Sequence, residues 1–221
     1  MKQLFTYLLT CGIIASCSVS KKVENQAIEK VFSFTQEEEL LLSKGKVSEP
    51  MRVLQITNKE DSITLRTASK NIDIINNTKL TKLLADRLLT TVNDPKNPGV
   101  GIAAPQIGIL KKMVAVQRFD KEDFPFEVYV NPTIKQYSKK TQFCLEGCLS
   151  IPDKMDTTKN RAYAILLEYE KLDGSREIEM VEAFTAVIFQ HEIDHLNGIL
   201  FTDHLDIEIE EAEERKRKNN E

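Results

Sequence analysis

The stretch His191-Glu192-Ile193-Asp194-His195 decides how this sequence is interpreted, because it places two histidines four residues apart. It continues an apolar run in which Phe184, Val187 and Ile188 recur at the spacing of a helix face. Both histidines are therefore predicted to project from the buried side of one helix. Two imidazoles so placed can hold a metal ion, and Glu192 beside them can take a proton from metal-bound water. Two ordinary surface histidines are the alternative.

Length and composition limit the class of protein. The chain has 221 residues, which predicts one domain with extensions or at most two, and its 41% apolar content suffices for a core. A net charge of -4 gives no electrostatic basis for binding nucleic acid. An acidic run ends in the basic cluster Arg215–Lys218, so residues 206–221 are predicted to form a charged C-terminal tail or helix.

The N-terminus has the pattern of a secretory signal. Leu4–Ala15 is mainly apolar and about as long as a signal-peptide core, and Ile14-Ala15-Ser16-Cys17 resembles the bacterial lipoprotein processing box. By that resemblance, residues 1–17 are a signal peptide, and a lipid on Cys17 attaches the protein to a membrane of the cell envelope. A buried helix, or a start assigned too early in a cytoplasmic protein, is the alternative. Residues 18–50 are mostly polar and are predicted to form a tether.

A cysteine is the candidate for a third ligand. Cys148 lies in Glu146-Gly147-Cys148-Leu149-Ser150-Ile151-Pro152, where Gly147 lets another backbone or a ligand approach closely. One Cys with two His leaves one position open in a four-coordinate site, as a catalytic metal requires. A buried free cysteine is the alternative. A four-cysteine zinc site is excluded, because no second cysteine pair follows Cys144 and Cys148.

The glycine-rich segment Gly99–Gly108 reads Gly-Val-Gly-Ile-Ala-Ala-Pro-Gln-Ile-Gly. It fits neither a phosphate-binding loop nor a dinucleotide fingerprint. Its small residues indicate backbone that runs close to a ligand or to another element. The side-chain amide of Gln106 can donate to a developing oxyanion, or it can be an ordinary buried amide with its partners satisfied.

Together and in this order, the three segments closely resemble the three signature motifs of the peptide deformylase family. The resemblance extends over residues 51–205, and it includes Met51–Ile56 and Gly198–Phe201. It implies a metal-dependent hydrolase that removes the formyl group from N-formylmethionyl peptides and releases formate. It also implies that residues 51–205 are the catalytic domain.

The resemblance assigns the reaction centre. One divalent ion, expected to be Fe(II), with Zn(II) or Ni(II) as alternatives, is held by Cys148, His191 and His195. Glu192 matches the family's general base, which later protonates the leaving amine. The Gln106 amide and the Leu149 backbone N–H match the donors to the oxyanion.

The resemblance also assigns the substrate side. Glu146 matches a residue that pairs with a downstream arginine, here Arg161, although the spacing from Cys148 differs by about one residue. Residues Asp153–Asn160 are more polar than the usual family segment, and this departure concerns peptide selectivity rather than metal chemistry. Asp194 either orients a ligand or is solvated, and His204 is predicted to lie on the surface. The residues assigned to substrate binding are Val100, Gly101, Glu146, Gly147, Phe184, Val187 and Ile188.

Periodicity predicts the remaining elements. Leucine spacing predicts a helix over 78–91. Strands are predicted over 112–117, 127–130, 164–169 and 177–181, with a hairpin turn at Leu172–Gly174. The predicted fold is α+β, with antiparallel sheets packed around a central helix that bears the His-Glu-x-x-His motif.

Two other functions are compatible with these residues. An exported metallopeptidase or amidase could use the same site on other small peptides, because water activation is common to both reactions. A non-catalytic peptide-binding lipoprotein could retain the fold alone.

Overall fold

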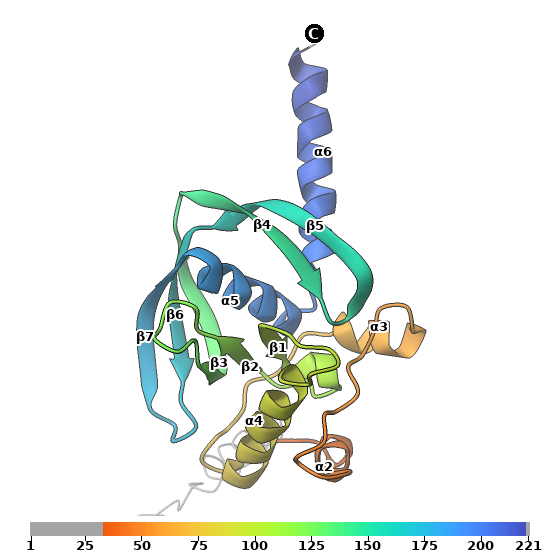
Figure 1. The fold of residues 1–221 in the computed structure, drawn as a ribbon, viewed down its shortest axis with the longest axis vertical. Coiled ribbons are helices and arrows are strands. Elements are labelled where there is room, and N and C mark those ends of the chain that lie inside the picture. Colours follow the sequence, from red (N-terminus) through yellow and green to blue (C-terminus); the bar gives the residue numbers. More distant parts are fainter. Residues whose placement is uncertain (1–32, 220–221) are drawn as a thin grey trace, which may run out of the picture. The chain divides into compact units, whose positions relative to one another are not determined.

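Two antiparallel sheets flank the helix that carries the paired histidines, Ala183–Leu196 (α5) (Figure 1). The computed structural model describes residues 33–219. Its larger sheet has five strands in the order β1-β2-β3-β6-β7, and its smaller sheet pairs β4 with β5. Every pairing is antiparallel, so the predicted α+β class with antiparallel sheets is confirmed. The strands are β1 (Gly101–Ala103), β2 (Met113–Gln117), β3 (Phe126–Tyr137), β4 (Thr141–Cys148), β5 (Ile151–Ala162), β6 (Ala164–Glu170) and β7 (Arg176–Glu182).

Helices cover the sheets and extend the chain at both ends of the described part. Among the described residues, none of them is both long and apolar enough to span a membrane. Besides α5 they are α2 (Gln36–Ser43), α3 (Lys59–Leu65), α4 (Thr78–Val92), the 3-10 helix η1 (Ala104–Ile107) and α6 (Phe201–Asn219).

The alternation of side chains along β2 divides the core into two layers. Met113 and Ala115 belong to the cluster that contains the buried face of α4, whereas Val114 and Val116 belong to the cluster that contains α5. Helix α5 also contacts β4 and β5. Because it is covered by both sheets, nearly all of its residues are buried, which explains the long apolar run in its sequence.

The structure differs from the predicted tether over residues 18–50. Residues 36–43 form α2, and Phe34 and Leu42 are buried in the same cluster as α4. The segment docks with only these two apolar side chains, because charged groups at its contact with the domain, such as Glu38 and Lys111, also bind across it. Composition alone did not reveal these contacts. The predicted signal peptide 1–17, the candidate lipidation site Cys17 and residues 18–32 lie outside the described residues.

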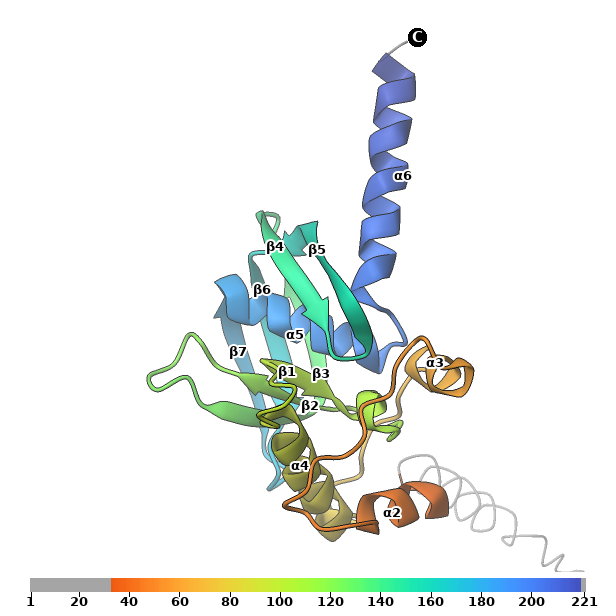
Figure 2. The same ribbon diagram turned by 45° about the vertical axis from the view of Figure 1, so that its right-hand side comes forward.

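The C-terminal segment is helical from an earlier point than the sequence indicated. Helix α6 begins at Phe201, and its first residues pack with Ile151 and Leu200 in a separate small cluster. The predicted charged tail or helix at 206–221 therefore continues a helix that starts in the core. Figure 2 shows that the later turns of α6 extend beyond the sheets.

Candidate metal centre and active site

Three side chains that can bind a metal come together between the small sheet and α5. The Sγ atom of Cys148 and one ring nitrogen each of His191 and His195 all lie within 4.8 Å of one another. The Sγ atom is 3.2 Å from Nε2 of His195. One helical turn places both histidines on the same face of α5, and β4 ends opposite that face. The structure thus joins the three predicted ligands.

The chemistry of these donors fits a catalytic metal. Burial raises the pKa of the Cys148 thiol, but the neighbouring His195 and His191 outweigh it and hold the pKa well below its ordinary value. The site therefore favours the thiolate, the form that binds metals. The Nδ1 atom of His191 is 2.8 Å from a carboxylate oxygen of Glu146. This bond fixes the ring and leaves Nε2 available as the ligand.

Glu192 lies beside the ligands in a buried position with unused hydrogen-bonding capacity. It is 4% exposed, and its Oε2 atom has no hydrogen-bond partner within residues 33–219. Burial raises the pKa of this carboxyl to about 7. A Cβ atom on Gly101 would lie 2.5 Å from Oε1 of Glu192, so only glycine fits there. The predicted close approach of the glycine-rich segment is therefore to the carboxylate.

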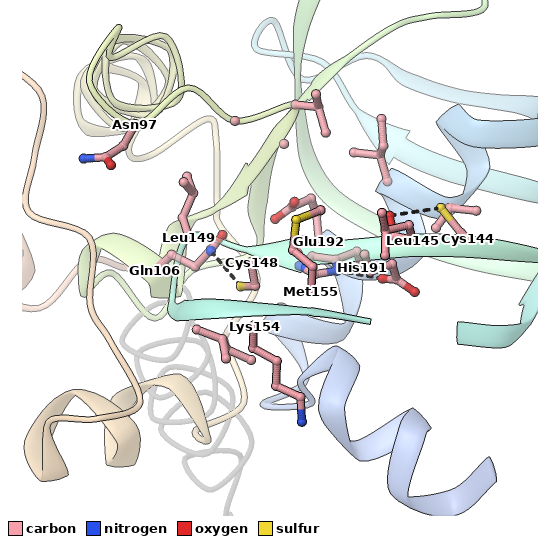
Figure 3. A pocket seen from close by; sticks show the side chains of 18 of the residues that line it. Asn97, Gln106, Cys144, Leu145, Cys148, Leu149, Lys154, Met155, His191 and Glu192 are labelled. Carbon is pink, nitrogen blue, oxygen red and sulfur yellow. Dashed lines mark hydrogen bonds and ion pairs between the residues drawn. The ribbon is translucent and has the colours of Figure 1, made fainter. Parts of the chain in front are cut away.

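The Gln106 amide has a fixed orientation toward the same centre. Its Oε1 atom accepts a hydrogen bond of 2.8 Å from the backbone N–H of Ala103. Its Nε2 atom faces the Cys148 Sγ atom at 3.7 Å (Figure 3). The same Nε2 atom donates to the Ser150 hydroxyl at 3.3 Å. The short helix η1 thus presents an N–H donor to the reaction centre, and Leu149, between Cys148 and Ser150, lines the same pocket.

The pocket in front of these groups has a volume of about 630 Å³. Of the predicted reaction-centre residues, Glu192, Gln106, Leu149, Cys148 and His191 line it, whereas His195 lies buried behind them. Every residue assigned to substrate binding also lines it, namely Val100, Gly101, Glu146, Gly147, Phe184, Val187 and Ile188.

Two further lining residues, Leu145 and Met155, were missed by the sequence analysis. They are 60% and 65% exposed, and Met155 pairs with Gly147 across the small sheet. Leu145 and Gly147 are two apart on β4 and so share a face. Strand alternation could have found Leu145, but β5 shows no apolar alternation that would reveal Met155.

Comparison with known proteins identifies the family. The family model for polypeptide deformylase matches residues 51–210. The chain belongs to the polypeptide deformylase family. It is a metal-dependent hydrolase that removes the formyl group from N-formylmethionyl peptides.

Relatives and solved deformylase structures agree. The chain is 36% identical to a peptide deformylase of Caulobacter vibrioides, over 70% of this chain and 87% of that protein. It is 41% identical to one of Desulfotalea psychrophila, over 70% of this chain and 89% of that protein. A peptide deformylase of Acinetobacter baumannii with Met-Ala-Ser bound has a TM-score of 0.60 and 32% identity, covering 71% of this chain and 99% of the other. The deformylase of Thermotoga maritima has a TM-score of 0.60 and 28% identity, covering 70% and 97%.

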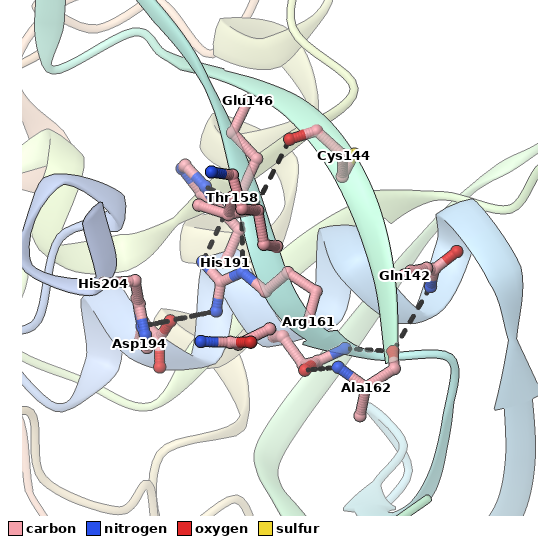
Figure 4. Close-up of polar contacts among 12 residues, drawn as sticks. Gln142, Cys144, Glu146, Thr158, Arg161, Ala162, His191, Asp194 and His204 are labelled. Atoms are coloured by element: carbon pink, nitrogen blue, oxygen red, sulfur yellow. Dashed lines mark hydrogen bonds and ion pairs between the residues drawn. The ribbon is translucent and has the colours of Figure 1, made fainter. Parts of the chain in front are cut away.

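Behind the candidate ligands of this deformylase lies a chain of ionic contacts (Figure 4). Nε and Nη2 of Arg161 donate to both carboxylate oxygens of Glu146, at 2.8 and 2.9 Å, so the predicted pairing is confirmed. Nη1 of Arg161 donates to Asp194 at 2.6 Å, and Nε2 of His204 is 2.8 Å from the same oxygen. Asp194 is therefore neither fully solvated nor bonded to a candidate ligand, and its side chain pairs with Arg161 and His204. The side chain of His204 is 33% exposed, so it lies at the solvent-facing end of these contacts.

An irregularity in the small sheet explains the unusual spacing between Cys148 and Arg161. Gln142 pairs with Arg161 and Cys144 pairs with Thr158, so β5 carries one more residue than β4 between these pairs. This β-bulge returns Arg161 to the buried side, opposite Glu146. A carboxylate oxygen of Glu208 in α6 accepts the backbone N–H groups of Lys159 and Asn160 inside the bulge. The additional residue therefore leaves the ion pair intact.

Proposed function

We propose that Cys148, His191 and His195 hold one divalent ion and that this site cleaves the formamide bond of N-formylmethionyl peptides. The observation that carries the proposal is the buried, unpartnered carboxylate oxygen of Glu192 beside three converging ligand atoms. Thiolate and imidazole donors suit Fe(II), our first choice, as well as Zn(II) and Ni(II). When bound, the ion supplies Lewis-acid activation of water near neutral pH. On this proposal, α5 is the central helix whose His-Glu-x-x-His motif organises the site.

Glu192 moves the protons in the proposed reaction. Its carboxylate takes a proton from the attacking water and then gives it to the nitrogen of the departing methionyl peptide. Burial favours the protonated form at the intermediate stage, because it raises the pKa of this carboxyl toward neutrality. Gly101 keeps the space beside the carboxylate open, since any side chain there would collide with it.

Gln106 and Leu149 stabilise the negative charge that develops on the formyl oxygen. The side-chain carbonyl oxygen of Gln106 accepts from Ala103, so its Nε2 atom is turned toward the reaction centre, where it donates to Cys148 Sγ and the Ser150 hydroxyl. The backbone N–H of Leu149 is the second proposed donor. Such donors are effective because they are already oriented when the charge appears.

The pocket is proposed to bind the methionine side chain and the peptide that follows it. Val187 and Ile188 are buried apolar residues of its wall, and Val100 and Phe184 are partly exposed at the same pocket. The related Acinetobacter baumannii deformylase was solved with Met-Ala-Ser bound, which supports a peptide substrate here.

Formate release from formyl-Met-Ala-Ser by anaerobically purified protein tests this function. Wild-type protein should release formate, and Glu192→Ala should not, although it retains its metal. Equal release by both proteins would refute the assignment of Glu192. No release by metal-loaded wild-type protein would refute the proposed function.

For the location, we propose export and lipid attachment at Cys17, with a cytoplasmic protein as the alternative. The support is the signal-like sequence of residues 1–17, with small residues before the cysteine. Radiolabelled palmitate should label the wild type but not Cys17→Ala in bacterial cells. An unlabelled wild type would contradict the proposal.

A further inference from the structure

The segment Ser33–Pro50, here called the N-terminal strap, precedes the part of the chain that the family model matches, residues 51–210. It nevertheless packs on the catalytic domain through α2 and the buried side chains of Phe34 and Leu42. Its polar contacts fall into two groups, one at each end of the strap. The groups differ in the part of the domain that they hold.

At its first end, the strap is attached by Glu38, which is only 8% exposed. Oε1 of Glu38 accepts the backbone N–H of Leu110 at 3.0 Å, and Oε2 accepts that of Thr35 at 2.8 Å. The ammonium of Lys111, which is 1% exposed, lies 3.8 Å from the carboxylate. The same ammonium donates to the Ser33 carbonyl oxygen and lies over the Phe34 ring. Glu38 thus binds two consecutive residues of the domain.

Those two residues directly follow the short segment 104–109, which carries Gln106. Gly108 ends η1, and a Cβ atom on it would lie 3.0 Å from Cδ2 of Leu41 in α2. The backbone N–H of Ile109 returns to the Ala104 carbonyl oxygen at 3.1 Å, so residues 104–109 form a closed turn. Through Leu41, helix α2 therefore lies close against the end of the turn. Glu38 binds Leu110 and Lys111, the two residues that follow the turn.

At its other end, the strap is attached by Arg87 of α4. The guanidinium is 4% exposed and donates to the backbone carbonyl oxygens of Lys44, Lys46 and Glu49. These contacts join the strap to α4, and among the described residues the guanidinium of Arg87 makes no hydrogen bond to residues 104–111. Arg87 thus offers a matched comparison, a buried cation that holds the strap away from the turn of Gln106.

We propose that Glu38 is a positioning residue for deformylation. Through Leu110 and Lys111 it fixes the turn 104–109, and this keeps the Gln106 amide directed at the reaction centre. The inference rests on the proposed role of Gln106 as a donor to the oxyanion. It makes the strap part of the catalytic unit, although the family match begins after it.

The test compares Glu38→Gln with Arg87→Gln in the full chain. The measurements are kcat and KM for formyl-Met-Ala-Ser, the melting temperature and the metal content. Both substitutions leave a buried polar group poorly paired, so both should lower the melting temperature. Only Glu38→Gln should lower kcat, by about 10-fold. This is part of the roughly 100-fold or greater loss expected when an oxyanion donor such as the Gln106 amide is removed altogether. KM and metal content should stay within about two-fold of wild type, the experimental scale of additivity.

A double-mutant cycle sharpens the test. In a Gln106→Ala background, adding Glu38→Gln should cause no further loss of kcat, because the group being positioned is gone. An equal loss of kcat in both backgrounds, or unchanged kcat in Glu38→Gln, would overturn the proposal. Leu41→Ala gives a milder second variant if Glu38→Gln does not fold, and it should lower kcat in the same direction.

The cycle also separates this proposal from the proposed function. If the wild type is active and Gln106→Ala lowers kcat while Glu38→Gln and Leu41→Ala do not, only the role of Glu38 is refuted. If Gln106→Ala leaves kcat unchanged, the oxyanion role of Gln106 is refuted and the role of Glu38 with it. An inactive wild type refutes the proposed function itself.

Discussion

Two arginines, Arg118 and Arg161, are buried in this molecule in similar ways, yet only one belongs to the reaction centre. Arg118 donates to Asp120 and Glu179, and its guanidinium lies over the rings of Tyr129 and Phe189. Arg161 donates to Glu146 and Asp194. Burial alone would lower the pKa of each guanidinium, but the carboxylates around it outweigh burial and raise the pKa.

The difference lies in what adjoins each arginine. The Arg161 cluster touches His191, and beside it lie two buried polar atoms without partners in residues 33–219, Oε2 of Glu192 and Nδ1 of His195. Within the same range, the side chains that bind Arg118 contribute no such atom. A shifted pKa therefore marks both a structural cluster and a catalytic one. Unpartnered polar atoms separate the Arg161 cluster from the Arg118 cluster, although Arg87 Nε and Ser69 Oγ elsewhere in residues 33–219 also lack partners.

The largest expected effect tests this distinction at Glu192. Glu192→Gln keeps the shape but removes the base, so kcat should fall by about 100- to 10,000-fold. The melting temperature should not fall, because no partner of Oε2 is lost. Steady-state kinetics and calorimetry on protein of equal metal content measure both. Glu127→Gln, beside Arg118, is the control and should keep wild-type kcat.

Arg118→Met should have the opposite profile. It leaves Asp120 and Glu179 without their shared cation, so the free energy of unfolding should fall by about 3–5 kcal/mol. The kcat value should be unchanged at temperatures where the variant is folded. Urea unfolding and formate release measure the two quantities. A loss of kcat at full folding would mean that this cluster supports the reaction.

Glu146→Gln tests the link from Arg161 to the metal. Weakening the bond between Glu146 and the His191 ring should lower metal affinity by about 10- to 100-fold. Competition with a chelating dye gives the affinity. Glu179→Gln is the matched substitution beside Arg118 and should not change it. Equal affinities for the two variants would show that the bond to His191 does not tune the site.

The Arg118 cluster should also control stability in acid. A hydrogen bond from Arg118 lowers the pKa of Asp120. Burial alone would raise the pKa of Glu127, but a hydrogen bond from Lys121 outweighs burial, so the pKa of Glu127 is lowered as well. Because the folded pKa values lie below the unfolded ones, this stabilisation is complete above about pH 5 and is lost progressively as pH falls below that. Urea unfolding between pH 6 and pH 3 should show a shallower decline for Arg118→Met. A parallel decline would contradict this account.

The smallest effect is expected at His204, the outer end of the Arg161 cluster. His204→Ala removes one contact of Asp194 but leaves the bond from Arg161, and the histidine is partly solvated. The free energy of unfolding should change by less than about 1 kcal/mol. Metal affinity should change less than in Glu146→Gln. A larger change would mean that His204, rather than Arg161, holds Asp194 in position.

The sequence predicts those parts of the molecule in which one local pattern determines the structure. Helix α4 follows an apolar period, and α5, β2, β6 and β7 carry local apolar runs or alternation. The predicted limits of α4 and of these strands agree with the structure within a few residues. The three candidate ligand residues, which the structure brings together, were predicted because their motifs are short and specific. Glu146 and Arg161 were paired through the family pattern rather than through any local signal.

Other parts could not be predicted, because their stability comes from contacts between distant residues. The small sheet is largely exposed on both strands, so β5 shows no apolar alternation. The strap was predicted to be a tether because the residues that bind it are far away in sequence. Lys111 lies beside Glu38, and Arg87 binds the other end of the strap. Arg118 is a single polar residue whose burial depends on elements brought together only by folding, and the contact of His204 with Asp194 likewise depends on the folded structure.

The bulge in β5, held by Glu208, has a consequence for how this enzyme can change over evolution. Residues on the turn side of the bulge, Ile151–Thr158, include Asp153, Lys154 and Met155 at the pocket, whereas Arg161 lies beyond it and supports His191 through Glu146. The one residue by which β5 exceeds β4 at the bulge is absorbed locally, so the phase of the strand is restored before Arg161. Selection can therefore rewrite the hairpin tip for new peptides while the metal chemistry is inherited unchanged.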